Sequence, residues 1–130
     1  MELMDIVAEL KNASVQMPEE KIDQFTEAVD THERIFVYGT GRSGLMLKAL
    51  AMRLMQMGYQ SYVVGETTTP SVGKGDLLIV ASASGETQSV CSAADDGAKQ
   101  GTDVLVITGS KECTLSRNHE PLIRIEAATK

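Results

Sequence analysis

Hydroxyl side chains gather in one short segment, Ser82-Ala83-Ser84-Gly85-Glu86-Thr87. An apolar run over residues 77–80 precedes it, and a helical pattern of small and apolar residues follows it. The segment is therefore predicted to be the turn from a buried strand into the N-terminus of a helix. Free backbone N–H groups and the positive end of the helix dipole bind anions there. We predict that Ser82, Ser84 and Thr87 bind a phosphate group, which Gly85 allows the backbone to approach closely.

An ordinary helix cap is the plainer interpretation of this segment. A single Ser or Thr caps a helix, and a carboxylate such as that of Glu86 often completes the cap. One cap needs only one hydroxyl, whereas this turn offers three. That surplus favours an anion site.

A second glycine-rich turn, Gly39-Thr40-Gly41-Arg42-Ser43-Gly44, follows the first predicted strand. It matches the dinucleotide-binding fingerprint, and Glu66 lies about twenty residues further on, where a ribose-binding acid is expected. A nucleotide-binding domain is therefore the strongest rival interpretation. Against it, Arg42 and Ser43 offer a charged fork and a hydroxyl to a terminal phosphate, and two such turns can close on one phosphate group.

Glu66 and Glu86 are the candidate catalytic bases of the site. Both are expected on loops at its mouth, where a carboxylate with a shifted pKa could transfer a proton. Each has a structural alternative, since Glu86 could complete the helix cap and Glu66 could fix its own loop. We interpret His32, before the first strand, and His119, in a polar loop, as solvated surface residues. We interpret the two cysteines, Cys91 and Cys113, as plain thiols, so we expect neither a disulfide framework nor a metal site.

The composition sets the class of protein. A chain of 130 residues, 42% of them hydrophobic, fits one compact domain. The formal net charge of −6 argues against nucleic acid as a partner. No apolar run is long enough to span a bilayer, and the first residues carry acids where a signal peptide needs basic residues. We therefore predict a cytoplasmic protein without a membrane or nucleic-acid partner.

Apolar strands alternate with helices along the chain. The strands are predicted at residues 35–38, 61–64, 76–81, 103–108 and 121–125, and helices at 3–16, 18–31, 45–57 and after residue 87. This order predicts a single α/β domain over 1–130, with N-terminal helices in 1–31 and an α/β core in 34–130. The fold class is a three-layer sandwich, a five-stranded parallel sheet with helices on both faces.

The predicted helix 45–57 is apolar around nearly its whole circumference. A helix that packs only on a sheet would have one apolar stripe, so this helix needs a second cover. Four methionines supply adaptable packing there: Met46, Met52, Met55 and Met57. We predict that the helix joins subunits of a homo-oligomer, a dimer or a tetramer.

Several segments together resemble the 6-phospho-3-hexuloisomerases, members of the sugar isomerase (SIS) domain family. They are the two turns already described, the helix segment 48–55, and the stretches 63–70 and 75–79. The turn at residues 82–87, called the serine-rich turn below, is typical of the whole SIS superfamily. The stretch Gly65-Glu66-Thr67-Thr68-Thr69-Pro70 points to this member. The likeness covers nearly the whole chain.

The resemblance implies a flavodoxin-like parallel sheet and a sugar phosphate held by Ser43, Ser82, Ser84 and Thr87. We expect Gly41, Arg42, Gly85 and Thr67 to contact the same substrate. The implied reaction interconverts 3-hexulose 6-phosphate and fructose 6-phosphate, a step of the ribulose monophosphate pathway, without metal or organic cofactor. A homo-oligomer, typically a tetramer, is implied as well.

The resemblance ends before the C-terminal segment from which the family supplies a catalytic Glu and His. The sequence stops at Lys130, just past the fifth predicted strand. We therefore expect the C-terminal helix to be missing, with the chain cut short or the gap covered by a partner subunit. Two further hypotheses stay open: a non-catalytic regulatory module that binds a sugar phosphate, and a nucleotide-binding domain.

Overall fold

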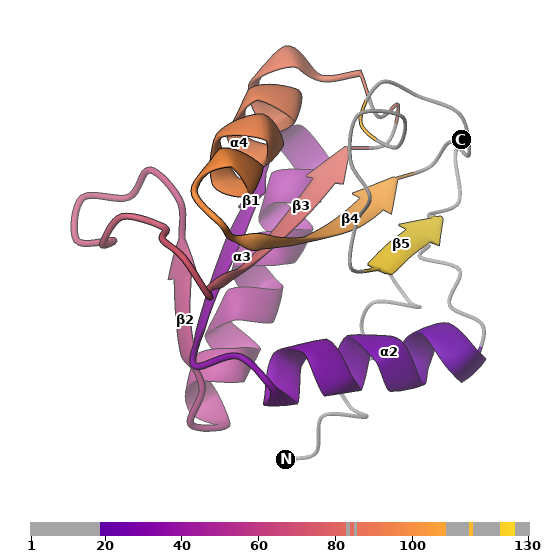
Figure 1. Ribbon diagram of the computed structural model, residues 1–130, viewed down its shortest axis with the longest axis vertical. Helices are drawn as coiled ribbons and strands as arrows, with labels where there is room; N and C mark the ends of the chain where they lie inside the picture. The colour runs from indigo at the N-terminus through magenta and orange to yellow at the C-terminus, as the bar shows by residue number, and fades with distance from the viewer. Residues whose placement is uncertain (1–18, 83, 85, 109–114, 116–122, 127–130) are drawn as a thin grey trace.

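Five parallel strands form the centre of the computed structural model, which describes residues 19–82, 84, 86–108, 115 and 123–126 (Figure 1). The five predicted strands are confirmed, each within two residues, and the predicted helix 3–16 lies outside the described residues. The elements follow in the order α2 (Glu19–Asp30), β1 (Arg34–Gly39), α3 (Gly41–Gln56), β2 (Gln60–Val63), β3 (Leu77–Ser82), α4 (Gln88–Lys99), β4 (Asp103–Thr108) and β5 (Ile123–Glu126).

The strand order in the sheet is β2-β1-β3-β4-β5, and every pair is parallel. From β1 the chain crosses first to β2 on one side and then to β3 on the other. In register, Gly39 at the end of β1 lies opposite Ala81 near the end of β3. The order of the strands therefore reverses between β1 and β3, and both strands deliver their following loops to the same edge of the sheet.

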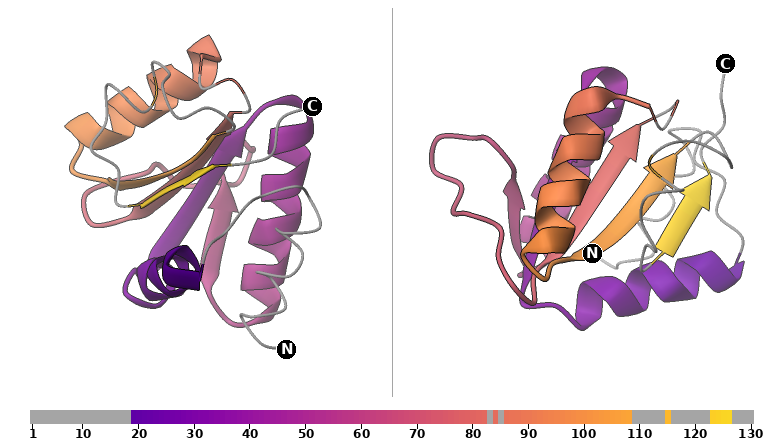
Figure 2. Two further views of the ribbon diagram at one scale, coloured as in Figure 1. Left: turned by 90° about the vertical axis from the view of Figure 1, so that its right-hand side faces the viewer. Right: turned by 45° about the horizontal axis from the view of Figure 1, so that its top comes forward.

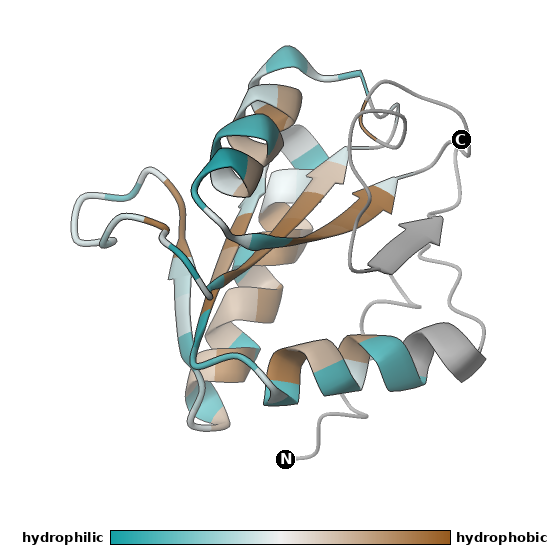
Figure 3. Cartoon of the chain, in the orientation of Figure 1, coloured by the Kyte–Doolittle hydropathy of each residue, from teal (hydrophilic) through white to brown (hydrophobic). Residues whose placement is uncertain are grey.

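Both faces of the sheet are buried. Helices α2 and α3 cover one face and α4 covers the other, which confirms the three-layer architecture (Figure 2). Side chains alternate between the faces along each strand. Ile35, Val37 and Ile79 join the cluster under α2 and α3, whereas Phe36 and Val80 pack under α4. Hydrophobic residues therefore run almost continuously along β3 and β4 (Figure 3). Full burial of each large apolar side chain contributes about 1.5–3 kcal/mol.

Helix α3 begins at Gly41, so the prediction that it starts at residue 45 was wrong. The glycine-rich turn becomes the first turn of the helix, in which the Gly44 N–H donates to Thr40 O at 3.1 Å. A Cβ atom on Gly44 would lie 2.6 Å from Gly39 O, closer than any side chain tolerates. Because residues 39 and 44 are both glycines, the first turn of α3 can pack directly against the end of β1.

Polar contacts close the opposite, N-terminal edge of the sheet. Arg34 of β1 donates to both carboxylate oxygens of Asp76, at 3.0 and 2.6 Å, and to Ser71 O at 2.9 Å. The Arg34 guanidinium, followed by the Gly73 N–H, holds the pKa of Asp76 below its usual range. These contacts fix the base of the long connection between β2 and β3.

The interpretation of His32 as a solvated residue was wrong. Its side chain is 9% exposed, and Nε2 lies 2.7 Å from Asp103 Oδ2. The reason is tertiary: β1 and β4 are both in the parallel sheet with only β3 between them, so the segment that enters β1 and the start of β4 lie at the same edge, and the ring reaches Asp103 there. His119 lies outside the described residues. Cys91 is buried on α4 and forms no disulfide within the described residues. Within the described part of the chain, no helix is both long and apolar enough to cross a membrane.

Candidate functional site

The two predicted phosphate turns leave adjacent strands at the point where the strand order reverses. The chain after β1 enters α3 on one face of the sheet, and the chain after β3 enters α4 on the other face. A crevice forms at such a point, beyond the carboxyl ends of the strands, and open α/β sheets bind their ligands there. A Cβ atom on Gly39 would lie 3.2 Å from Ala81 O, which shows how closely the end of β1 approaches β3.

The start of α3 is open to an anion. Its N-cap residue, Thr40, makes no side-chain cap hydrogen bond, and the first turn holds no acidic residue. The N–H groups of the first three helical residues, 41–43, precede the first N–H that has an acceptor at the helix start, that of Gly44. Arg42 is exposed and Ser43 is half-buried in the same turn. The helix start thus places Gly41, Arg42 and Ser43, which are predicted to bind the ligand, just beyond the carboxyl end of β1.

The start of α4 has the same character. Its N-cap residue is Thr87, whose hydroxyl makes no cap hydrogen bond and lies instead 2.9 Å from Ser82 Oγ. The first turn again holds no acidic residue. Ser82 is the last residue of β3 and is 4% exposed. The side chain of Thr87 therefore does not act as an ordinary cap, and it joins the end of the strand to the start of the helix.

Ser84 and Glu86 form the exposed part of this turn. The Glu86 N–H donates to Ser84 Oγ at 3.0 Å, which leaves the serine hydroxyl proton able to donate to a ligand. Both residues are exposed to solvent. Gly85, predicted to contact the substrate, lies outside the described residues.

Glu66 and Thr67 lie apart from the serine-rich turn. They follow β2, which is separated from β3 by β1, so that about 10 Å divides the two strand ends. Both residues are exposed, and Lys48 Nζ on α3 lies 4.0 Å from Glu66 Oε2. Within the described residues, Glu66 thus shares its surroundings with α3 and not with Ser84.

Two hollows flank the loop that carries Glu66. One, of about 420 Å³, lies between this loop and the C-terminal half of α4, and Asp96 and Gly97 line it. The other, of about 390 Å³, lies between α3 and β2, where Lys48 and Met52 line it. Glu66 and Thr69 line both, whereas none of the hydroxyl residues of the serine-rich turn lines either.

Thr108 is a polar residue at this edge that the sequence analysis missed. It ends β4, is fully buried and lies in register with Ser82. In the sequence, the only local sign of this residue is a threonine at the end of an apolar run. Its position beside Ser82 depends on the pairing of β3 with β4, which the local sequence does not reveal. Among the described residues, no group of three or more His, Cys, Asp or Glu side chains could hold a metal ion.

The comparisons with known proteins agree with this geometry. A model of the SIS domain matches residues 29–130. The 3-hexulose-6-phosphate isomerase of Bacillus subtilis is 36% identical over 126 residues, which cover 97% of this chain and 68% of that protein. The enzyme of the same name from Mycobacterium gastri is 36% identical over 122 residues, covering 94% of this chain and 61% of that protein.

A solved structure shows the same fold. It is that of a Methanococcus jannaschii protein for which a molecular function of 3-hexulose-6-phosphate isomerase was inferred, and it superposes with a TM-score of 0.77 at 32% identity, over 98% of this chain and 71% of that one. With the fold, the family model and the relatives in agreement, the chain belongs to the SIS domain family, among the relatives of 3-hexulose-6-phosphate isomerase.

Proposed function

We propose that this chain binds a sugar phosphate in the crevice between the ends of β1 and β3. The supporting observation is that two helices on opposite faces of the sheet start just beyond the ends of these two strands, each without a side-chain cap bond and without an acid in its first turn. Their N–H groups and dipoles favour an anion. The hydroxyls of Ser43, Ser82, Ser84 and Thr87 supply further donors to the phosphate oxygens.

The reaction we propose is the interconversion of 3-hexulose 6-phosphate and fructose 6-phosphate in the cytoplasm, the step that belongs to the ribulose monophosphate pathway. The relatives that carry the isomerase name support it. The carbonyl group moves between C3 and C2, so one proton leaves one carbon and another arrives at its neighbour, through an enediol. Such a step needs a base near the carbons and an acid near the oxygens.

Glu86 and Glu66 are the carboxylates we propose for proton transfer. Glu86 shares a turn with Ser84, so a phosphate bound there would place the rest of the sugar near it. Glu66 would act from the neighbouring strand end, beside Thr67, while Gly41, Arg42 and Gly85 contact the substrate. A Glu86→Gln or Glu66→Gln change in a true base is expected to lower turnover by about 100-fold or more while leaving binding nearly unchanged.

Calorimetric titration with fructose 6-phosphate tests the binding site. We expect Ser84→Ala to weaken binding by about 1–3 kcal/mol, the loss of one charge-assisted hydrogen bond. Ser92→Ala, an exposed serine further along α4, is the matched control and should bind like the unchanged chain. Equal affinities for all three proteins would refute the assignment of the turn.

Three ligands and one assay separate the competing hypotheses. Binding of fructose 6-phosphate with turnover of 3-hexulose 6-phosphate supports the isomerase. Binding without turnover favours the non-catalytic regulatory module. Binding of NAD but of no sugar phosphate favours the nucleotide-binding domain. Fructose without its phosphate serves as the negative control, because it lacks the group that both turns would hold.

We also propose that the chain forms a homo-oligomer through α3. Leu45, Met52 and Met55 are 68%, 57% and 55% exposed, although they are large and apolar. Together with Lys48 they follow each other at intervals of three, four and three residues, which places them within about a quarter of the helix circumference. Met46 and Met57 instead pack against the core. The exposed stripe borders the hollow beside β2, and a second copy of α3 would cover it.

A further inference from the structure

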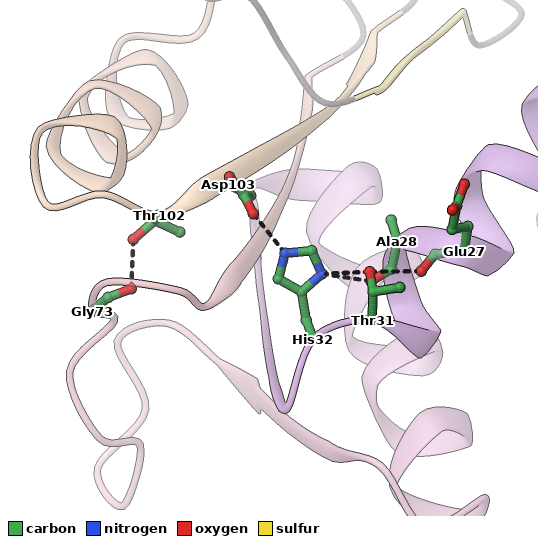
Figure 4. A network of polar contacts seen from close by, with 7 residues as sticks. All are labelled: Glu27, Ala28, Thr31, His32, Gly73, Thr102 and Asp103. Atoms are coloured by element: carbon green, nitrogen blue, oxygen red, sulfur yellow. Dashed lines mark hydrogen bonds and ion pairs between the residues drawn. The ribbon is translucent and has the colours of Figure 1, made fainter.

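One histidine, at the sheet edge opposite the candidate site, has an acceptor at each ring nitrogen. His32 follows the end of α2, and its Nδ1 lies 2.6 Å from Ala28 O (Figure 4). Its Nε2 lies 2.7 Å from Asp103 Oδ2, at the start of β4. The imidazole thus joins the last turn of α2 to the sheet.

Neither contact can form without an N–H on the ring. A carbonyl oxygen and a carboxylate oxygen both accept, and a neutral imidazole carries only one N–H. The hydroxyl of Thr31 is 3.4 Å from Nδ1, but it donates to Glu27 O at 2.8 Å. We infer that His32 is bound as the imidazolium cation and acts as a proton-dependent clamp between α2 and β4.

The surroundings of the ring suit a cation. The last turn of α2 holds no basic residue, so the imidazolium supplies the positive charge that stabilises the C-terminal end of the helix. Asp103 faces the ring from β4. Asp76, just before β3, is close enough for the histidine to add to the lowering of its pKa, after the larger effects of Arg34 and Gly73.

Other charged groups lie on the neighbouring elements. Arg34 of β1 is a cation at this edge, and its charge is matched by Asp76 through two hydrogen bonds; the side chain of Lys74 lies against Gly101, two residues before Asp103. Glu33 follows the histidine in sequence, and Asp30 of α2 is bound to Tyr59. Strand β5, which packs against α2, carries Arg124 and Glu126 in its sequence. The two short contacts of the ring are therefore both with acceptors, the carbonyl of Ala28 and the carboxylate of Asp103.

The clamp makes the packing of α2 depend on pH. Phe25, Ala28 and Val29 of α2 are buried in the core, so the helix is part of the folded domain. Raising the pH removes a proton from the ring and therefore one of its two contacts, whereas the unfolded chain has no such contact to lose. The free energy of unfolding therefore falls as the pH rises through the range in which the imidazolium loses its proton.

Urea unfolding of the full chain between about pH 5.5 and about pH 8.5, the range in which histidines change charge, tests the clamp. We expect the unfolding equilibrium constant of the unchanged chain to rise by about threefold to tenfold over this range, relative to Asp103→Asn. An asparagine amide can donate to Nε2 as well as accept from it, so this variant no longer needs the second ring proton. Asp96→Asn, an exposed carboxylate on α4, is the matched control and should keep the full pH dependence.

Nitrogen-detected NMR of the histidine rings in the unchanged chain gives an independent answer, even if Asp103→Asn fails to fold. The sequence has two histidines, and His119→Gln leaves only the signals of His32. Two ring N–H signals at neutral pH support the clamp. A single N–H at neutral pH, or equal pH dependence in the unchanged chain and Asp103→Asn, overturns it.

Discussion

At the scale of single residues, glycine decides how closely α3 approaches β1. Gly44 lies inside the helix, and the nearest backbone atom to an added Cβ would be Gly39 O at 2.6 Å. The positions of the added Cβ atom and of Gly39 O are both set by the backbone, so no side-chain rotation can relieve the contact. The distance between the start of α3 and the end of β1 therefore depends on this residue.

We expect Gly44→Ala to destabilise the fold by about 1–3 kcal/mol, the usual effect of overpacking. Gly73→Ala is the matched control. An added Cβ there meets nothing closer than Asp76 Oδ2 at 3.8 Å, so we expect a change within about 0.5 kcal/mol. Urea unfolding of both variants makes the comparison, and equal effects would show that the close approach is not what constrains Gly44.

Tyr59 makes a pH-dependent contact between the α3–β2 turn and α2. Its hydroxyl donates to the Asp30 carboxylate, and this hydrogen bond, with partial burial, raises the pKa of Tyr59 from 10.0 to about 12. The folded chain holds this proton more tightly than the unfolded chain. The stabilisation is therefore complete below pH 10 and is lost as the pH rises towards 12.

Tyrosinate absorbance measured against pH tests this contact. One of the three tyrosines should ionise near pH 12, and Tyr59→Phe should remove that step and lower the stability at neutral pH by about 0.5–1.5 kcal/mol. If the high-pH step persists in Tyr59→Phe, it belongs to another tyrosine.

At the scale of elements, the connection between β2 and β3 is tied down at its base and open at its tip. Asp76 accepts from Arg34 and from the Gly73 N–H at 2.7 Å, and Thr102 donates to Gly73 O at 3.0 Å (Figure 4). The tip, which carries Glu66, is exposed. These hydrogen bonds fix the end of the connection at the N-terminal edge of the sheet, while its first residues lie at the opposite edge, where β2 ends.

Asp76→Asn is expected to lower the stability at neutral pH by about 1–3 kcal/mol, because hydrogen bonds to a charged, buried carboxylate are lost. The pKa of Asp76 is lowered in the fold, so its contribution is present above about pH 3.9, the ordinary value, and is lost as the pH falls through the folded value. Acid unfolding curves compare the variant with Asp96→Asn. An unchanged acid transition in Asp76→Asn would contradict the role of this carboxylate.

The local sequence pattern was enough to predict the strands and the serine-rich turn. Each apolar run, and the spacing of Ser82 and Thr87, can be recognised within one short segment of the chain. The early start of α3 was not predictable in this way, because Gly41 and Gly44 disfavour a helix until the strand end is in place. The contact between His32 and Asp103 joins residues 71 positions apart. Such pairs, like that of Ser82 with Thr108, require the strand order, which no local pattern contains.

At the scale of the whole molecule, the exposed stripe on α3 predicts association. We expect the double change Met52→Lys and Met55→Lys to convert an oligomer to a monomer, because it places charges where apolar side chains would meet. Light scattering after size-exclusion chromatography measures the mass. Ala98→Lys, on the exposed side of α4, is the control that should leave the oligomer intact. An unchanged mass in the double variant would rule out this face as the interface.

The parallel order of the strands also governs how the chain folds as it is synthesised. No adjacent pair can form as a local hairpin, because parallel neighbours need a crossover between them. Strand β1 ends at Gly39, its first partner begins at Gln60, and its second is complete only at Ser82. At about 5–20 residues per second, the apolar β1 stays without its β3 neighbour for several seconds on the ribosome. A nascent chain of this protein should therefore be a substrate for chaperones until β3 emerges, and the crevice between the two strands cannot exist before then.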